Sequence, residues 1–134
     1  MRAPTHRPAR PRPGAAPAEG TSRLASGRGL RVCLTSAPAR DAARIARLLV
    51  DRRVAACVSE LPAVRSTYRW NGSLERSREV LLLIKTTRAA LARCVALLAA
   101  EHPYEVPEIL VATPGWASAS YGAWVHAETA WVSA

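Results

Sequence analysis

The dipeptide Asn71-Gly72 separates two extended runs of residues and determines how they pair. The first run is VRSTYRW (64–70), and the second ends in EVLLLIKT (79–86). Asn-Gly is typical of a two-residue type I′ turn, because both central residues of that turn adopt positive φ. The sequence therefore predicts a long antiparallel hairpin. Pro62 cannot donate a ladder hydrogen bond, so it predicts a bulge or an edge position in the first strand.

The returning strand contains an unbroken apolar run from Val80 to Ile84. A sheet with one face in water shows alternating polar and apolar residues, whereas a continuous run indicates burial on both faces. One face would be covered by helices of the same chain. A partner subunit is the natural cover for the other face, so we expect self-association.

The remaining patterns complete an α+β fold. Apolar residues at helical spacing predict a helix from Asp41 to about Arg53 and a second helix that Thr86 or Thr87 caps and that ends by Glu101. Branched, extended runs predict strands, and the expected order is strand 30–36, helix, strand 54–61, the hairpin, helix, strand 108–114 and a helix at 119–128. This order, β-α-β-β-α-β with a C-terminal helix, is the ferredoxin-like pattern.

The net charge of +9 is divided between two regions. Residues 1–29 are rich in Arg, Pro and Ala and contain six Arg and one acid. Such a composition predicts a disordered tail, with a basic arm for anionic surfaces as the alternative. Residues 30–134 form the expected domain and carry the smaller share of the excess charge. We therefore expect no nucleic-acid partner, and no apolar run approaches the length of a membrane span.

Three cysteines occur without a Cys-x-x-Cys pair. An odd and sparse count does not form a disulfide framework and suits a reducing cytoplasm. Cys33 and Cys57 are expected on strands that are neighbours or nearly so, and two thiols close together would offer a soft-metal site. The alternative is that each cysteine is a small buried apolar residue.

The stretch HPYEVPEI (102–109) concentrates polar residues between a helix and a strand. One interpretation is a set of metal ligands or acid/base groups made by His102, Glu105 and Glu108. The other is a stiff connector, because Pro103 ends the preceding helix and Pro107 prepares the next strand. In an extended segment the two glutamates would project to opposite faces, so shared acid/base chemistry is not expected.

A second candidate site is a cleft between subunits of the expected oligomer, lined by Trp70, Lys85, Tyr104 and Glu105. Lys85 precedes a helix N-terminus, a position that suits an anion, or it could pair with a neighbouring glutamate. Gly-rich phosphate loops, nucleophile elbows and zinc-protease motifs do not occur in the sequence. We therefore expect a binding protein without an organic cofactor, and not an enzyme.

Five segments in this order carry a resemblance to a known family. They are TSAP (35–38), RRVAACV (52–58), STYRWNG (66–72), EVLLLIKTT (79–87) and HPYEVPEI (102–109). Together they resemble the CutA divalent-cation-tolerance family over about residues 30–130. The resemblance implies a ferredoxin-like subunit in a tight cytoplasmic homotrimer, with a role in tolerance to divalent metals, copper binding and no established reaction.

The resemblance also suggests metal ligands. Copper ligands proposed in some members are a Cys directly before a T/S-A-P motif and a His-His pair before Pro-Tyr. This chain has Thr35 at the first position and Glu101-His102 at the pair, so only His102 carries over, with Glu101 beside it. Two hypotheses follow: a trimeric metal-response protein that binds copper or another divalent cation at His102 and Glu101, or a trimeric small-ligand sensor or scaffold that binds an anionic metabolite or a partner in the subunit clefts.

Overall fold

The computed structural model describes residues 29–130. The predicted tail lies outside this range except for its last residue, and so do residues 131–134. The elements of the described part are β1 (Leu30–Ala37), α1 (Ala39–Asp51), β2 (Cys57–Trp70), β3 (Ser73–Thr87), α2 (Leu91–Glu101), β4 (Leu110–Ala112) and α3 (Ala119–Glu128). The predicted α+β order is confirmed.

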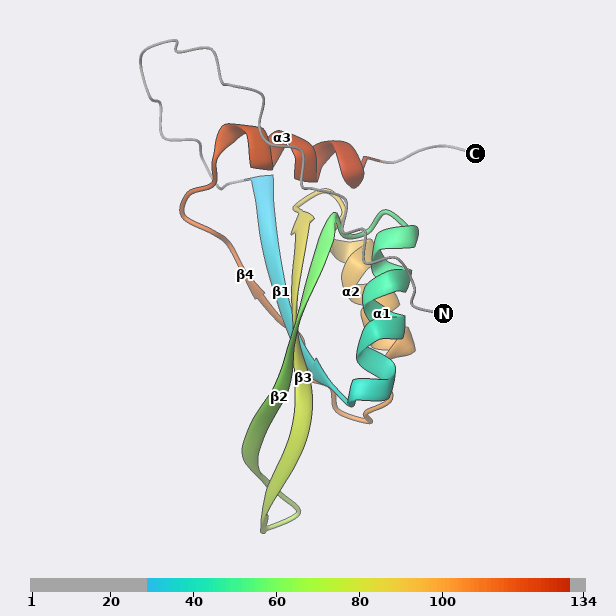
Figure 1. Cartoon of the computed structure of the whole chain (residues 1–134), viewed down its shortest axis with the longest axis vertical. Coiled ribbons are helices and arrows are strands. Elements are labelled where there is room, and N and C mark those ends of the chain that lie inside the picture. Colours follow the sequence, from blue (N-terminus) through green and yellow to red (C-terminus); the bar gives the residue numbers. More distant parts are fainter. Residues whose placement is uncertain (1–28, 131–134) are drawn as a thin grey trace, which may run out of the picture.

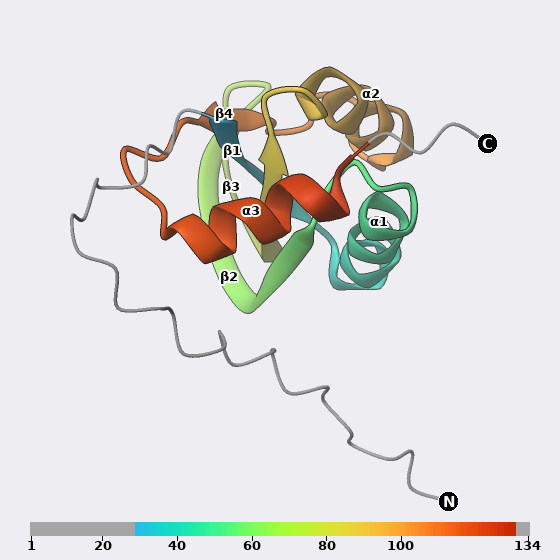
Figure 2. The ribbon, with the colours of Figure 1, turned by 90° about the horizontal axis from the view of Figure 1, so that it is seen from above.

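The strands form one antiparallel sheet in the order β2-β3-β1-β4. Helices α1 and α2 lie side by side on one face of this sheet, and α3 crosses its end (Figures 1 and 2). This arrangement is the ferredoxin-like fold that the sequence predicted. Within the described residues, no helix is both long and apolar enough to cross a membrane.

The core lies between the sheet and the two helices. Leu82 and Ile84 of β3 are fully buried there, together with Ile45 of α1 and Leu98 of α2. Burying each of these side chains contributes about 2 kcal/mol. In α1 the buried residues recur at helical spacing, as Ala42, Ile45, Ala46 and Leu49. The hydrophobic pattern therefore determines which face of the helix meets the sheet.

Some boundaries differ from the prediction. Helix α1 begins at Ala39, directly after Pro38, and ends at Asp51, and Arg53 adopts a left-handed φ of 57°. Strand β2 begins at Cys57, three residues later than expected. Strand β4 contains three residues instead of seven. The prolines at 107 and 114 lie on either side of it and cannot donate ladder hydrogen bonds, so the strand stays short.

Two threonines at the end of β3 have different roles. The Thr86 hydroxyl is buried and donates a hydrogen bond to the carbonyl oxygen of Val54, 2.6 Å away. The Thr87 hydroxyl accepts a hydrogen bond from the backbone N–H of Ala90, 3.2 Å away, just ahead of α2. Of the two predicted capping residues, Thr87 therefore stabilises the turn into the helix.

The hairpin has the predicted turn and the predicted bulge. Asn71 and Gly72 have φ of 49° and 79°, the signs that a type I′ turn requires. The register shifts between Leu61 and Val64, and Ala63 there has a φ of 58°. We call the part beyond this bulge, residues 64–79, the outer hairpin. It extends past the helices, away from the core (Figure 1).

The face of the sheet opposite α1 and α2 is largely uncovered by the described chain. Leu81 and Leu83 alternate with the buried Leu82, so they point to this second face, and both are only partly buried. Helix α3 covers one end of the sheet, where Val125 packs against Leu30. The apolar run in β3 therefore has a cover on one face only within a single chain.

Candidate functional site

A groove lies between the outer hairpin and the segment that follows α2. Its volume is about 680 Å³, within the range of small-molecule sites. The hairpin supplies one wall, and residues 103–108 supply the other. The lining residues are Ser36, Ser66, Tyr68, Trp70, Ser77, Glu79, Pro103, Tyr104, Glu105, Val106 and Glu108. The groove thus gathers aromatic rings, hydroxyl groups and three carboxylates.

His102 anchors the second wall. Its side chain is buried, its Nε2 donates a hydrogen bond to the carbonyl oxygen of Ser36 at 2.9 Å, and its Nδ1 accepts one from the backbone N–H of Tyr104 at 3.1 Å. These partners require the neutral ring with its proton on Nε2. The imidazole therefore joins the end of β1 to the segment after α2 and has no nitrogen left for another ligand.

Tyr104 and Glu79 connect the two walls of the groove. The Tyr104 hydroxyl donates to a carboxylate oxygen of Glu79 at 3.2 Å. Partial burial, followed by the negative charge of Glu79 and this hydrogen bond, raises the pKa of Tyr104 to about 12. The phenol therefore stays protonated at physiological pH and remains a donor.

Glu105 and Glu108 both line the groove. The expectation that they point to opposite faces was wrong, because the segment bends and is not an extended strand. Glu108 accepts a hydrogen bond from the Ser36 hydroxyl at 3.0 Å, which gives the connector a second attachment to β1. The connector interpretation of HPYEVPEI is therefore confirmed for its His102 and Glu108 contacts.

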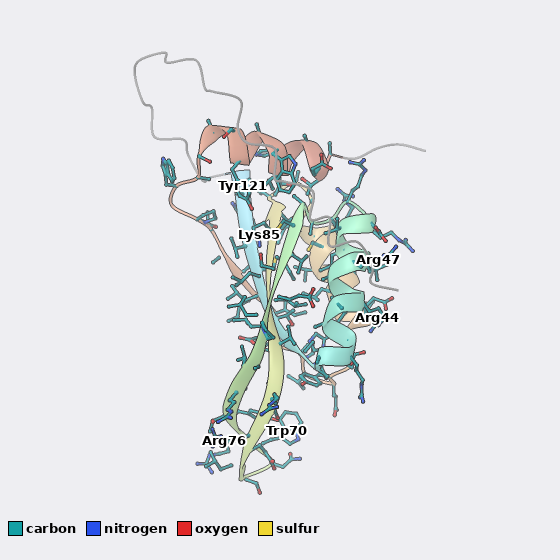
Figure 3. All side chains as sticks on the ribbon, in the orientation of Figure 1. Arg44, Arg47, Trp70, Arg76, Lys85 and Tyr121 are labelled. Atoms are coloured by element: carbon teal, nitrogen blue, oxygen red, sulfur yellow. The ribbon has the colours of Figure 1, made fainter. Side chains whose placement is uncertain are left out.

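The aromatic wall comes from the outer hairpin. Tyr68 and Trp70 are two residues apart on one strand, so their side chains lie on the same face. The Tyr68 hydroxyl is 2.7 Å from the Ser77 hydroxyl on the partner strand. Trp70 is 45% exposed and lies near the tip of the hairpin (Figure 3). The rings are thus available to a ligand in the groove.

Lys85 does not join this groove within one chain. Its ammonium group donates to the Ser59 hydroxyl at 2.6 Å and to the carbonyl oxygen of Leu83 at 3.1 Å. Figure 3 shows Lys85 near the end of the sheet that α3 covers, far from Trp70. Pairing of Lys85 with Glu105 or Glu108 is therefore wrong for the single chain.

The residues at the family's metal position do not fit a metal ion in this arrangement. Both nitrogens of His102 are engaged, and the Glu101 carboxylate accepts from Arg44 at 2.8 Å. Thr35, which replaces the expected cysteine, is fully buried. Across residues 29–130, no three metal-binding side chains converge. A bound ion would have to displace a partner of His102, and the Glu101 carboxylate is already paired with Arg44.

The cysteine pair differs from the predicted one. Cys33 faces the helices, opposite Ile84, whereas Cys57 pairs with Lys85 at a position that points to the other face. The proposed approach of Cys33 to Cys57 is therefore wrong. Cys33 instead shares a hydrogen bond with Cys94 of α2, and both side chains are fully buried. This hydrogen bond, together with burial, raises the pKa of the Cys94 thiol.

Glu79 was missed as a site residue. The sequence places it at the start of the apolar run, where a charged residue suggests only a strand end. In the structure the residue is 6% exposed and still lines the groove. Strand alternation was the available signal, because Glu79 shares a face with Leu81 and Leu83 and not with the core.

Comparisons with known proteins place the chain in a family. The family model described as "CutA1 divalent ion tolerance protein" matches residues 31–128. A divalent-cation tolerance protein CutA of Thermus thermophilus is 39% identical over 99 residues, which cover 73% of this chain and 96% of that one. Protein CutA of Mus musculus is 38% identical over 92 residues, 69% of this chain but only 52% of the mouse protein.

A solved structure agrees with these matches. The "PII-like protein CutA" from Nostoc sp. PCC 7120 superimposes with a TM-score of 0.72 and is 34% identical, covering 75% of this chain and 97% of that one. The fold, the matched residues and the relatives lead to one conclusion. This chain belongs to the CutA1 divalent ion tolerance protein family.

Proposed function

We propose that this CutA-family chain acts as a homotrimeric binding protein whose groove takes a small molecule with a cationic group. The buried carboxylate of Glu79 carries the proposal. Its only hydrogen-bond donor among the described residues is the neutral Tyr104, and none of residues 29–130 forms an ion pair with it. With no cation beside it in the described chain, this carboxylate offers an acceptor to the charged group of a ligand.

The rest of the groove supports the same ligand class. Glu105 and Glu108 add negative charge, and the lining contains no Lys or Arg. The rings of Tyr68, Trp70 and Tyr104 offer faces for cation–π contacts with an ammonium or guanidinium group. These features favour a cationic group over the anionic metabolite that the sequence suggested, and binding over catalysis.

Self-association is supported by the second face of the sheet. Partly buried and exposed apolar side chains gather there, namely Val32, Leu34, Leu61, Leu81, Leu83 and Leu110. An apolar surface of this kind indicates a protein contact. The trimeric state comes from the family resemblance. Sedimentation at micromolar concentration tests it: the mass should be three times the 14.4 kDa of one chain, and a monomer would contradict it.

Direct metal binding remains a prediction of the family resemblance, with His102 and Glu101 as its residues. The contacts of both side chains argue against a tight site. Calorimetric titration of Cu²⁺ and Zn²⁺ into the wild type and His102→Ala tests the point. We expect weak and identical curves, and a tight site lost in the variant would contradict this expectation. Location in the cytoplasm also stays a prediction.

Thermal denaturation with added ligands tests the groove. Arginine, spermidine and choline should raise the midpoint as their concentration rises, because a ligand that binds only the folded state stabilises it. The shift should disappear in Glu79→Gln. Glu75→Gln is the matched control, since it removes the same charge from the exposed part of the same strand. Equal shifts in both variants, or shifts with metal chlorides alone, would overturn the proposal.

A further inference from the structure

Four arginines lie on one face of the outer hairpin. Arg65 is directly opposite Arg78 in the antiparallel register, and Arg76 and Arg69 occupy positions of the same parity further toward the tip. The ladder pairs that establish this are Arg65↔Arg78, Thr67↔Arg76 and Arg69↔Leu74. Paired residues share a face, and alternate residues on a strand share it too. All four side chains are exposed. We call this surface the arginine face.

The arginine face has no counter-charge within the described chain. In residues 29–130 the ion pairs involve other arginines, and the hydrogen bond found for this group joins Arg69 Nη1, as donor, to the Gly72 carbonyl at 3.4 Å. The acids of the outer hairpin, Glu75 and Glu79, pair with Tyr68 and Val64 and so lie on the opposite face. Positive and negative charges are therefore segregated between the two faces.

This segregation costs stability in the isolated chain. Like charges directly opposite each other on a sheet repel, as Arg65 and Arg78 do. Like charges placed opposite each other, with no acid of the same chain to neutralise them, indicate a functional surface. An anionic partner would offset this repulsion.

We propose that the arginine face binds the phosphate backbone of a nucleic acid, without sequence specificity. Guanidinium groups bind phosphate oxygens through two parallel hydrogen bonds. From Arg65 to Arg69 the strand advances about 13 Å, a distance that spans about four phosphates of one DNA strand. A two-stranded ribbon is also narrow enough to enter the major groove. Charge number and spacing therefore match a polyanion.

A membrane surface fits the arginine face less well. Binding to a bilayer would combine arginines with apolar side chains that enter the interface on the same side. Tyr68 and Trp70 point to the opposite face by strand alternation, which leaves Leu74 as the one large apolar side chain beside the arginines. The expectation of no nucleic-acid partner rested on net charge. Net charge does not show which charged side chains share one face of the hairpin.

Fluorescence anisotropy with a labelled 20-base-pair DNA tests the proposal on the full chain. Four phosphate contacts contribute about −3.6 to the slope of log K against log salt, which corresponds to a fall in affinity of about 150-fold between 50 and 200 mM salt. Arg65→Ala/Arg78→Ala should reduce that fall to about 10-fold, because two contacts are lost. Both substitutions are at exposed positions, so the fold should persist.

Arg40→Ala/Arg47→Ala is the matched control. It removes the same charge from α1, where both side chains are exposed and Arg47 projects from the helix (Figure 3). This control should keep the wild-type slope. Equal losses in the two double variants would overturn the proposal, because they would reflect net charge alone. So would a changed sedimentation mass of Arg65→Ala/Arg78→Ala, which would assign the face to contacts between copies, or binding to phosphatidylserine vesicles without binding to DNA.

Discussion

The Tyr104 hydroxyl donates a hydrogen bond to the Glu79 carboxylate across the groove, with 3.2 Å between the two oxygens. The bond joins the segment after α2 to the base of the outer hairpin, two parts of the chain that are 25 residues apart. It also supplies the sole described donor to a buried negative charge. Geometry and electrostatics of the groove therefore depend on the same contact.

Replacing Tyr104 with Phe should lower the free energy of unfolding by about 1–2 kcal/mol, because Glu79 loses its donor. Urea denaturation followed by circular dichroism would measure this change. Tyr68→Phe is the control, since its hydroxyl bonds an exposed serine hydroxyl and should matter less. A Tyr104→Phe variant as stable as the wild type would show that water satisfies Glu79 equally well.

The same tyrosine should make stability depend on alkaline pH. Its pKa is about 12 in the folded chain against 10.0 when unperturbed. The folded state therefore keeps a proton that the unfolded state releases, and this contribution to stability is complete below pH 10 and lost as pH rises toward 12. Ultraviolet titration should show one tyrosine ionising last, and Tyr104→Phe should remove that step. A wild type whose tyrosines all ionise near pH 10 would contradict the expectation.

His102→Ala should destabilise the fold by about 3 kcal/mol. The substitution leaves the Ser36 carbonyl and the Tyr104 N–H without their buried partners, each worth about 1–3 kcal/mol. Glu101→Ala breaks an exposed ion pair and should cost less than about 1 kcal/mol. Denaturant midpoints of the two variants compare these losses of stability. If the neighbouring substitutions cost the same, the imidazole is not the anchor that its contacts indicate.

Leu83→Glu should dissociate the proposed trimer. The side chain points to the face of the sheet that α1 and α2 leave uncovered, and a buried glutamate in each copy would be strongly unfavourable there. Sedimentation should show the mass of a single chain. Val50→Glu, on an exposed position of α1, should leave the mass unchanged. If both variants dissociate, the substitutions cause general unfolding. If neither variant dissociates, the subunits associate through a different surface.

The two fully buried thiols should resist modification. The hydrogen bond with Cys33, together with burial, raises the pKa of Cys94, so little thiolate forms there at pH 8. Ellman's reagent should therefore react with at most Cys57 in the folded protein and with all three cysteines after unfolding. Cys57→Ser should abolish the folded-state reaction. Rapid modification of two thiols would show that the core opens around the pair.

Local chemistry explains what the sequence predicted correctly. Asn71-Gly72 specified the turn because few dipeptides tolerate two positive φ angles, and Pro62 marked the bulge because it lacks a donor. The apolar spacing in α1 and β3 likewise identified the core face of each element. Such signals act over a few residues, so they can be read without knowing the rest of the fold.

The contacts that build the groove are not local. Glu79 was overlooked because its partner Tyr104 comes from another element, and Glu105 was misplaced because the segment bends where an extended one was expected. Cys33 and Cys57 were expected to approach each other because their strands are close in the sheet. Two side chains on a sheet meet only when they also point to the same face, and these two do not. In each case the missing information was the direction of a side chain in three dimensions.

The outer hairpin carries both proposed surfaces on one narrow ribbon, with Tyr68 and Trp70 on one side and Arg69 and Arg76 on the other. Two strands without a core of their own are only marginally rigid. A ligand that orders the ribbon from one side therefore removes part of the entropic cost of binding on the other. We expect the two surfaces to be thermodynamically linked, so that each ligand tightens the binding of the other by the same factor.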